Sequence, residues 1–264
     1  MKLTIYQVDA FTDKVFGGNP AAVIPLQAWP EDSLMQKIAM ENNLSETAFF
    51  VKTDEGYHLR WFTPQNEIDL CGHATLASAY VIKNFLEPHI QEIQFSTQVA
   101  GILKASAKDG LYTLDFPARV PETSEIPETL LESLGVDVVV EVLKSRDYFV
   151  VLPNEEAVQN LDPDFSLMKE LDAFGVIATA KGHSADAVSR CFFPKAGIQE
   201  DPVTGSAHCN IVPYWSEKLG KKELSCKQLS KRGGDLLCEL KDGRVLMSGK
   251  CVLYMTGEIL LNHA

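Results

Sequence analysis

Three polar residues stand at positions where a side chain could move protons. Glu46 follows the first expected helix and opens an apolar strand, and burial there would suit a general acid or base. His73 and Asp201 lie in segments that contain glycine and lead into helical stretches. A helix N-terminus would lower the pKa of His73 and keep its imidazole neutral, which suits a proton relay. Taken singly, Glu46 could be a solvated residue and Asp201 an Asx-turn residue, but the set predicts acid–base catalysis.

Three further residues are candidates for other roles. Cys71 precedes the same helical stretch as His73, where a thiol could be an activated thiolate. Asn19 follows two glycines and could either hold a tight turn or orient a carboxylate of the ligand. His208 could either cap its helix or be a packed side chain. A metal site of Cys71, His73 and His58 is poorly spaced, so we predict no metal.

A short motif occurs twice, 130 positions apart (190 minus 60). Each copy reads Arg-x-Phe-x-Pro, beginning at Arg60 and at Arg190, and the residues eleven positions further on are Cys71 and Asp201. A helical stretch follows each copy. The shared spacing predicts an internal duplication that produces two pseudo-symmetric halves.

The boundary between these halves is expected in the run of prolines and acidic residues from Pro117 to Pro127, which has no hydrophobic periodicity. We expect the N-terminal half to cover residues 1–118 and to be completed by a C-terminal strand at about 251–264. The C-terminal half then covers 119–250.

A duplication of this kind would let the two strand–loop–helix corners face each other across one cleft. Each corner would aim a helix N-terminus, with its unpaired backbone N–H groups, at the same ligand. Such an arrangement binds a carboxylate and stabilises an enolate that forms beside it. Because Cys71 has Asp201 as its counterpart in the duplicated spacing, a symmetric two-cysteine racemase is disfavoured.

Composition excludes several classes of protein. The net charge of -12 and the lack of a long basic run argue against nucleic-acid binding. The sequence contains no glycine-rich phosphate loop, so we expect no nucleotide cofactor. No apolar stretch approaches the ~20 residues of a membrane-spanning helix, and the six cysteines form no Cys-x-x-Cys pair. These features predict a cytoplasmic protein with reduced thiols and no membrane partner.

Strand-like segments dominate the chain, and their spacing by Gly and Pro predicts an α+β fold with a mostly antiparallel sheet. The expected strands are 3–8, 22–24, 48–51, 57–62, 112–116, 147–152, 175–179, 189–193, 235–240, 244–247 and 252–255. Helices are expected after Pro30, at 74–85 and 206–219, at 127–134 ending at Gly135, and at 166–174 ending at Gly175.

Motifs along nearly the whole chain resemble the PhzF-like family, which is named for a phenazine-biosynthesis isomerase and has a diaminopimelate-epimerase-like fold. Four segments carry this resemblance, and a weaker fifth lies near the C-terminus. They are Asp9-Ala10-Phe11-Thr12 through Gly18-Asn19-Pro20-Ala21-Ala22-Val23, Asn43 through Phe49, Arg60-Trp61-Phe62-Thr63-Pro64 through Cys71-Gly72-His73-Ala74-Thr75, Glu200 through His208, and Ser230-Lys231-Arg232-Gly233-Gly234.

The resemblance implies two similar halves, each a barrel-like sheet around a central helix, and commonly a homodimer. It implies that Glu46 is the general acid–base, assisted by His73 and Asp201, and acts on a small cyclic or unsaturated carboxylate. The residues expected to bind the substrate are Asn19, Ser45, Cys71, Gly72, Gly205 and Ser206. In the related epimerases cysteines occupy both corners, and the second corner differs here.

The leading hypothesis is therefore a cofactor-independent isomerase that transfers protons on a small carboxylate in the cleft between the halves. Two alternatives belong to other classes. One is a racemase or epimerase that uses the single thiol of Cys71. The other is a non-catalytic protein that binds a metabolite or a partner in the same cleft.

Overall fold

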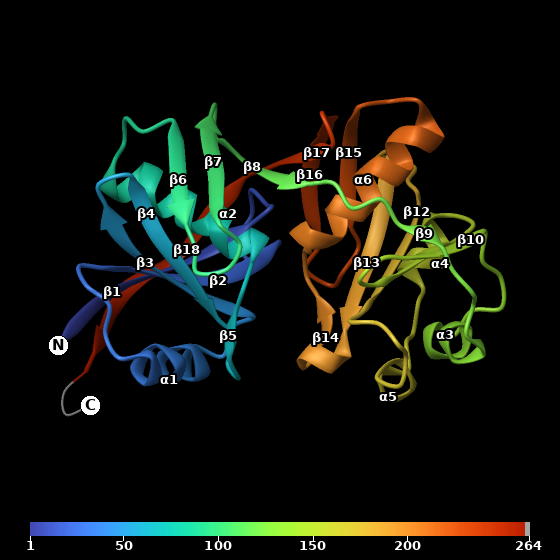
Figure 1. The fold of residues 1–264 in the computed structure, drawn as a ribbon, viewed down its shortest axis with the longest axis horizontal. Coiled ribbons are helices and arrows are strands. Elements are labelled where there is room, and N and C mark those ends of the chain that lie inside the picture. Colours follow the sequence, from blue (N-terminus) through green and yellow to red (C-terminus); the bar gives the residue numbers. More distant parts are fainter. Residues whose placement is uncertain (262–264) are drawn as a thin grey trace. The chain divides into compact units, whose positions relative to one another are not determined.

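The computed structural model describes residues 1–261 and divides the chain into two compact units (Figure 1). The first unit contains Met1–Asp115 and the chain from Ser248 onward, and the second is Phe116–Met247. Residues 262–264 of the strand expected at the C-terminus lie outside the described residues. The domain boundaries expected from the sequence, 1–118 with about 251–264 and 119–250, stay a prediction.

The first unit is a sheet with two main helices. Its strands pair in the order β18-β1-β2-β3-β4-β6-β7-β8, with β5 beside β4, and only β2–β3 and β4–β6 are parallel among these pairs of described strands. The elements are β1 (Lys2–Ala10), β2 (Asn19–Leu26), α1 (Asp32–Asn42), β3 (Glu46–Thr53), β4 (Gly56–Phe62), β5 (Glu67–Ile68), α2 (Gly72–Val81), the π-helical turn η1 (Ile82–Leu86), β6 (Glu92–Ser96), β7 (Ile102–Lys108), β8 (Leu111–Pro117) and β18 (Cys251–Leu260).

The second unit repeats this topology. Its strands pair in the order β9-β10-β11-β12-β13-β15-β16, with β14 beside β13, and β11–β12 and β13–β15 are the parallel pairs that correspond to β2–β3 and β4–β6. The elements are β9 (Glu122–Thr123), α3 (Glu128–Leu134), β10 (Glu141–Lys144), β11 (Tyr148–Val151), α4 (Glu155–Gln159), α5 (Phe165–Met168), β12 (Val176–Lys181), β13 (Ala187–Phe193), η2 (Pro194–Ala196), β14 (Ile198–Asp201), α6 (Gly205–Leu219), β15 (Glu223–Gln228), β16 (Gly234–Lys241) and β17 (Arg244–Gly249).

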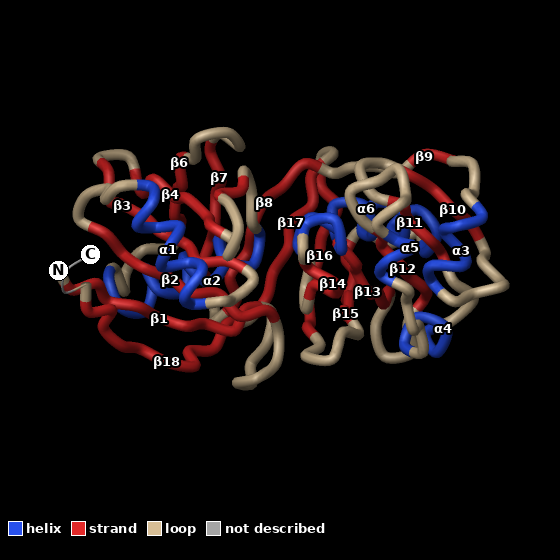
Figure 2. Tube along the Cα trace, turned by 90° about the horizontal axis from the view of Figure 1, so that it is seen from below, coloured by secondary structure: helices blue, strands red, loops and turns tan. Residues whose placement is uncertain are grey.

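One helix in each unit lies inside the curve of its own sheet. Helix α2 contacts strands from both ends of the sheet, including β1, β2, β7 and β18, and almost every residue of α2 is buried. A helix that is apolar on all sides is typical of such a central position. Helix α6 contacts β12, β13, β15 and β16 in the same way. The sheet therefore wraps around a central helix in each unit, and β1 and β18 run side by side in the first (Figure 2).

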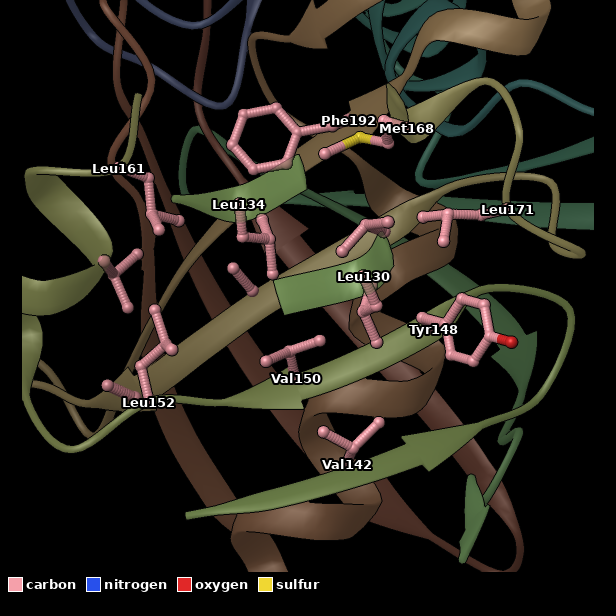
Figure 3. Packing of buried hydrophobic residues seen from close by; sticks show 14 of the residues in the cluster. Leu130, Leu134, Val142, Tyr148, Val150, Leu152, Leu161, Met168, Leu171 and Phe192 are labelled. Atoms are coloured by element: carbon pink, nitrogen blue, oxygen red, sulfur yellow. The ribbon is translucent and has the colours of Figure 1, made fainter. Parts of the chain in front are cut away.

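The opposite face of each sheet packs against outer helices. In the first unit, Met35 and Ile38 of α1 pack on apolar side chains of β1 to β4. In the second unit, Leu130 and Leu134 of α3 point toward Val150 of β11, and further apolar side chains close this cluster (Figure 3). Both faces of each sheet are therefore covered, one by the central helix and the other by outer helices.

The expected α+β fold with a largely antiparallel sheet is confirmed, but one helix is shorter than expected. The helix predicted for 166–174 is only α5, and Gly175 is not its C-terminal cap. A Cβ atom at Gly175 would lie 2.2 Å from the ring of Phe193, so close packing explains this glycine. Gly135, by contrast, ends α3 with a left-handed φ of 67°, as predicted. Through residue 261, no helix combines the length and apolar character needed to cross a membrane.

The repeated Arg-x-Phe-x-Pro motif has the same structural role in both units. Arg60 in β4 donates from Nε and Nη2 to the two carboxylate oxygens of Glu67 in β5, both at 2.7 Å. Arg190 in β13 holds Glu200 in β14 by the same fork, at 2.7 and 3.0 Å. Each arginine thus fixes the short strand that leads to the central helix. This fork leaves the side chain of Glu200 only 21% exposed.

We expect Arg60→Met to lower the free energy of unfolding by about 2 kcal/mol, because it leaves Glu67 without its partly buried partner. Urea denaturation measures this change. The control is Lys2→Met, since the Lys2–Glu258 pair is 66% and 57% exposed, and we expect a loss below about 1 kcal/mol. Equal losses in the two variants would contradict the anchoring role of the fork.

Candidate active site

Three elements of the first unit bring Asn19, Glu46 and His73 together. Asn19 and Glu46 are the first residues of β2 and β3, and the parallel register places Ala21 opposite Glu46. His73 is the second residue of α2. The side chains of all three are buried, with exposures of 0%, 6% and 4%. The sequence prediction that Glu46 is buried at a strand edge is confirmed.

The carboxylate of Glu46 and the imidazole of His73 form the closest polar pair of this site. Oε2 of Glu46 lies 3.0 Å from Nε2 of His73. Neither atom has an aligned hydrogen bond to any described residue, so the pair is a close ionic contact and not a well-directed bond. Catalytic hydrogen bonds are often poorly aligned before substrate binds and tighten in the complex.

The other imidazole nitrogen faces two different side chains. Nδ1 of His73 lies 3.1 Å from Nδ2 of Asn19 and 3.5 Å from Sγ of Cys71. If Nδ2 of Asn19 donates, Nδ1 is an acceptor and a neutral ring carries its proton on Nε2, toward Glu46; with the amide turned over, Oδ1 of Asn19 accepts from the Nδ1–H of a protonated ring. Asn19 therefore orients His73, in addition to any contact that it makes with a ligand.

The pKa of His73 is raised well above its usual value. Burial by itself lowers the pKa, but the neighbouring Cys71 and the Glu46 carboxylate outweigh burial. The thiol keeps its proton near neutral pH, so the carboxylate is the charge that favours imidazolium. The prediction that the helix N-terminus keeps His73 neutral is wrong, because the adjacent Glu46 has the larger effect.

Cys71 is the N-cap residue of α2 and is 6% exposed. Burial and, to a smaller extent, the charge of Glu46 raise the pKa of its thiol, His73 opposes both, and the net result is a pKa of about 11. The expectation of an activated thiolate is therefore wrong. A helix N-terminus lowers a thiol pKa only where the gain exceeds the cost of burying the charge.

The second unit holds Asp201 in a compact network. Oγ1 of Thr204 donates to Oδ2 of Asp201 at 2.6 Å, and Nε2 of Gln228 donates to the backbone oxygen of Asp201 at 2.6 Å. Oε1 of Gln228 accepts from the backbone N–H of Thr204 at 2.8 Å. Sequence reasoning missed Thr204 and Gln228. No local signal marks Gln228, because its contact joins β15 to the start of α6.

The structural counterpart of Cys71 is Thr204, not Asp201. Cys71 is the N-cap residue of α2 and Thr204 that of α6, 133 positions apart (204 minus 71). The Asp-Gly turns at Asp109 and Asp242, which precede β8 and β17, are also 133 apart (242 minus 109). The two arginines are 130 positions apart but the two helix starts are 133 apart. The second unit therefore has three more residues between Arg190 and Thr204 than the first unit has between Arg60 and Cys71. A second thiol is still absent from this position.

The other expected binding residues lie at helix or strand starts. Gly72 and Gly205 are the first residues of α2 and α6, and Ser206 follows Gly205. Ser45 is half-buried and directly precedes Glu46. The structure thus places Asn19, Cys71 and His73 together with Glu46, whereas Asp201 and Ser206 belong to the second unit. Their roles in binding stay predictions.

Within residues 1–261, the side chains that could jointly hold a metal ion are Glu46, Cys71 and His73, whose ligand atoms all lie within 4.8 Å of one another. His58, which the sequence analysis weighed as a metal ligand together with Cys71 and His73, packs beside Trp29 instead. Two surface hollows, of about 560 Å³ beside Phe165 and 190 Å³ beside Trp61, are not lined by any of the three residues.

The fold and the buried carboxylate–imidazole pair define a class of protein: a duplicated α+β chain with ionisable residues at the start of a central helix. A family model described as phenazine biosynthesis-like protein, PhzC-PhzF, matches residues 8–257. The chain belongs to this family, which confirms the resemblance seen in the motifs.

Relatives from distant organisms match over nearly their full length. The chain is 50% identical to the uncharacterized isomerase PA2770 of Pseudomonas aeruginosa, over 99% of this chain and 100% of that one. It is 46% identical to the uncharacterized isomerase BH0283 of Halalkalibacterium halodurans, over 99% and 100%. The human phenazine biosynthesis-like domain-containing protein is 38% identical, over 98% and 99%.

Solved structures share the fold. A PhzF-family protein of Enterococcus faecalis is similar with a TM-score of 0.96 and 50% identity, over 99% of this chain and 100% of that one. A hydroxyproline epimerase of Agrobacterium vitis has a TM-score of 0.64 at 9% identity, over 98% and 92%. The second likeness shows a common fold.

The buried His208 predicts a specific pH dependence of stability. Its Nδ1 donates to the backbone oxygen of Thr204, four residues earlier, at 2.8 Å, and its side chain is fully buried, so it has the packing role and not the capping role of the two that the sequence left open. Burial lowers its pKa from 6.5 to about 4. Between these values the unfolded chain binds more protons, so the free energy of unfolding falls as pH falls.

We expect the wild-type protein to lose about 2 kcal/mol more than His208→Gln between pH 7 and pH 5. Glutamine keeps an N–H donor but does not titrate, and the carboxylates contribute equally to both proteins. Urea denaturation at each pH measures the difference. Parallel pH dependences in the two proteins would contradict a neutral, buried His208.

We expect the Cys71 thiol to react with iodoacetamide about 100-fold more slowly in the folded protein than in the same protein unfolded in urea. The reason is its raised pKa together with its burial. Mass spectrometry of the alkylated peptide at pH 7.5 measures the rate. Reaction at the unfolded rate would instead indicate an accessible thiolate.

Proposed function

We propose that this chain is an isomerase that transfers a proton from one carbon to another on a small carboxylate substrate, with Glu46 as the general acid–base. The observation that carries this proposal is the buried pair of Glu46 Oε2 and His73 Nε2, 3.0 Å apart. A carboxylate held away from water beside an imidazole is a typical acid–base constellation. The names of the relatives, uncharacterized isomerases, support the reaction class.

In the proposed reaction Glu46 takes a proton from a substrate carbon and returns it at another carbon. His73 acts on the opposite side of the carboxylate, where its protonated ring stabilises the Glu46 anion before proton transfer. The negative charge that develops on the substrate is stabilised by backbone N–H groups at the start of α2, beginning with Gly72. No redox change occurs, because one proton is removed and one is returned, and the carboxyl proton of Glu46 exchanges with solvent between the two steps.

We propose that Asp201 assists this reaction and that Gly205 and Ser206 contribute binding donors from the start of α6. The support is local: Oγ1 of Thr204 donates to Oδ2 of Asp201 at 2.6 Å, so this carboxyl group is held in a fixed position just before the start of α6. A site between the two halves, a small-molecule carboxylate as substrate, a cofactor-free reaction, a cytoplasmic location and a homodimer all remain part of this proposal.

Two alternatives receive less support from the geometry. A racemase that uses the single thiol of Cys71 needs a thiolate, whereas burial raises the pKa of this thiol to about 11. A protein that only binds a metabolite does not require an ionisable pair in its interior. Burying such a pair costs free energy, which favours a catalytic reason for keeping it.

Deuterium exchange tests the proposal. The protein is incubated in D2O with a panel of small cyclic, unsaturated and amino carboxylates, and mass spectrometry detects deuterium at carbon. We expect the wild-type protein to label at least one compound and Glu46→Gln to lower the rate by about 1,000-fold or more, because glutamine accepts no proton.

The matched control is Glu41→Gln, which removes an exposed carboxylate on α1 and should leave labelling unchanged. Glu46→Gln with wild-type labelling would exclude Glu46 as the base. A compound that raises the thermal stability of the protein but returns without label would favour the binding-protein alternative.

A further inference from the structure

Three side chains that differ in chemistry converge at the start of α2. Glu46 comes from β3, Cys71 is the N-cap residue of α2, and His73 follows two residues later. One ligand atom of each, a carboxylate oxygen, a sulfur and an imidazole nitrogen, lies within 4.8 Å of the others. All three residues are at least nine-tenths buried.

This set of donors matches the ligands that zinc prefers. Cysteine sulfur, imidazole nitrogen and carboxylate oxygen are the three protein ligand types of Zn²⁺, and a site with three protein ligands leaves one position for water or another ligand. Softer sulfur and nitrogen donors disfavour Mg²⁺ and Ca²⁺, which take oxygen ligands. The cluster is therefore selective by chemistry for a thiophilic divalent cation.

The protein contacts leave two of these atoms incompletely satisfied. Oε2 of Glu46 and Nε2 of His73 are fully buried, and neither makes an aligned hydrogen bond with any residue up to 261. Buried polar atoms are nearly always paired, and one cation between these two atoms would pair both. These two atoms are 3.0 Å apart and can face one cation.

Asn19 supplies the outer contact that a metal-binding histidine requires. A histidine that binds a cation through Nε2 carries its proton on Nδ1 and donates it to an acceptor. The side-chain amide of Asn19 lies 3.1 Å from Nδ1. Turning this amide by half a rotation presents Oδ1 to that proton, since the amide is similar in shape in both orientations.

We propose that Glu46, Cys71 and His73 form a binding site for a thiophilic divalent cation, Zn²⁺ above all. Binding brings the three ligand atoms to about 3.5 Å from one another, as tetrahedral zinc bonds of 2.0–2.3 Å require. The thiol proton of Cys71 and the Nε2 proton of His73 leave for solvent as the sulfur–zinc and nitrogen–zinc bonds form, and no electron is transferred. A short movement of the Cys71 side chain brings sulfur toward the Glu46 side of the ring.

A cation in this position has a consequence that rests on the proposed function. The cation occupies the lone pairs of Glu46 and His73 that would otherwise bind protons. The protein therefore cannot bind zinc and catalyse the proposed reaction at the same time. Release of zinc would restore the acid–base pair. The metal binding itself is independent of the reaction and is tested without a substrate.

Cobalt provides the test, because Co²⁺ takes the same ligands and absorbs light when bound to thiolate. The full chain, reduced with a phosphine and freed of metal by a chelator, is titrated with Co²⁺ and followed by near-ultraviolet and visible absorption. We expect a thiolate-to-cobalt charge-transfer band that saturates at about one ion per chain and disappears when Zn²⁺ is added.

Variants assign the band to the cluster. We expect Cys71→Ser to abolish the band and Glu46→Gln to weaken cobalt binding by at least about 10-fold. The control is Cys251→Ser, which removes another cysteine of the first unit and should leave the band unchanged. Circular dichroism verifies that each variant is folded.

Two results would overturn the proposal. One is a wild-type protein without the charge-transfer band, which does not depend on the folding of any variant. The other is a band that persists in Cys71→Ser and disappears in Cys226→Ser, since Cys226 and Cys238 are also adjacent thiols. Neither result bears on deuterium labelling, so failure here is distinct from failure of the proposed isomerase activity.

Discussion

The structure depends on one constraint, which is that the central helix of each unit begins in the interior of the unit. The N–H groups of the first turn have no partner within the helix, and in the interior they cannot all be solvated. In the first unit the residues at this point are Cys71, Gly72 and His73, and Thr75 returns a hydrogen bond to the carbonyl of Cys71 at 2.5 Å. A partial positive charge that is fixed in a region of low dielectric favours a carboxylate nearby. The burial of Glu46, which would otherwise be costly, follows from this arrangement.

The arginine forks maintain this constraint from outside the site. Arg60 anchors β5 through Glu67 and also donates from Nη1 to Asp32 at the start of α1, at 2.8 Å. Arg190 anchors β14 and donates from Nη1 to the backbone oxygen of Leu161 at 2.7 Å. In each unit the same residue therefore ties the strand before the central helix to the outer helical layer. Both copies of the duplicated unit contain this anchor. Each anchor holds the strand that leads into the central helix, although the residues at the two helix starts differ.

Sequence patterns predicted most of the fold and the residues of the first corner, but not the electrostatics. The strands at 3–8, 57–62 and 189–193 were identifiable because β-branched and aromatic residues alternate between turn formers. The prediction that Asp201 is the counterpart of Cys71 is wrong, because it takes the 130-residue spacing of the arginine motif as constant. The Asp-Gly turns at Asp109 and Asp242 show that the spacing is three residues longer in the later part of each half. The pKa of His73 depends on Glu46, 27 residues away in the chain, and such a contact between strand and helix has no local signature. Gln228 was missed for the same reason.

The two units show how one backbone can support different chemistry. At the first helix start the N-cap residue is Cys71, and its neighbours Glu46 and His73 carry exchangeable charge in the interior. At the second the N-cap residue is Thr204, whose hydroxyl accepts from Gln228 at 3.2 Å and donates to Asp201. Because the hydroxyl of Thr204 accepts from the amide of Gln228, its own proton points toward Asp201. The carboxylate of Asp201 is therefore the acceptor at the end of this chain. The first corner thus places an imidazole against a carboxylate, whereas the second ties its carboxylate into a chain of a hydroxyl and an amide. A duplication that began with equivalent corners would in this way give the two helix starts different chemistry.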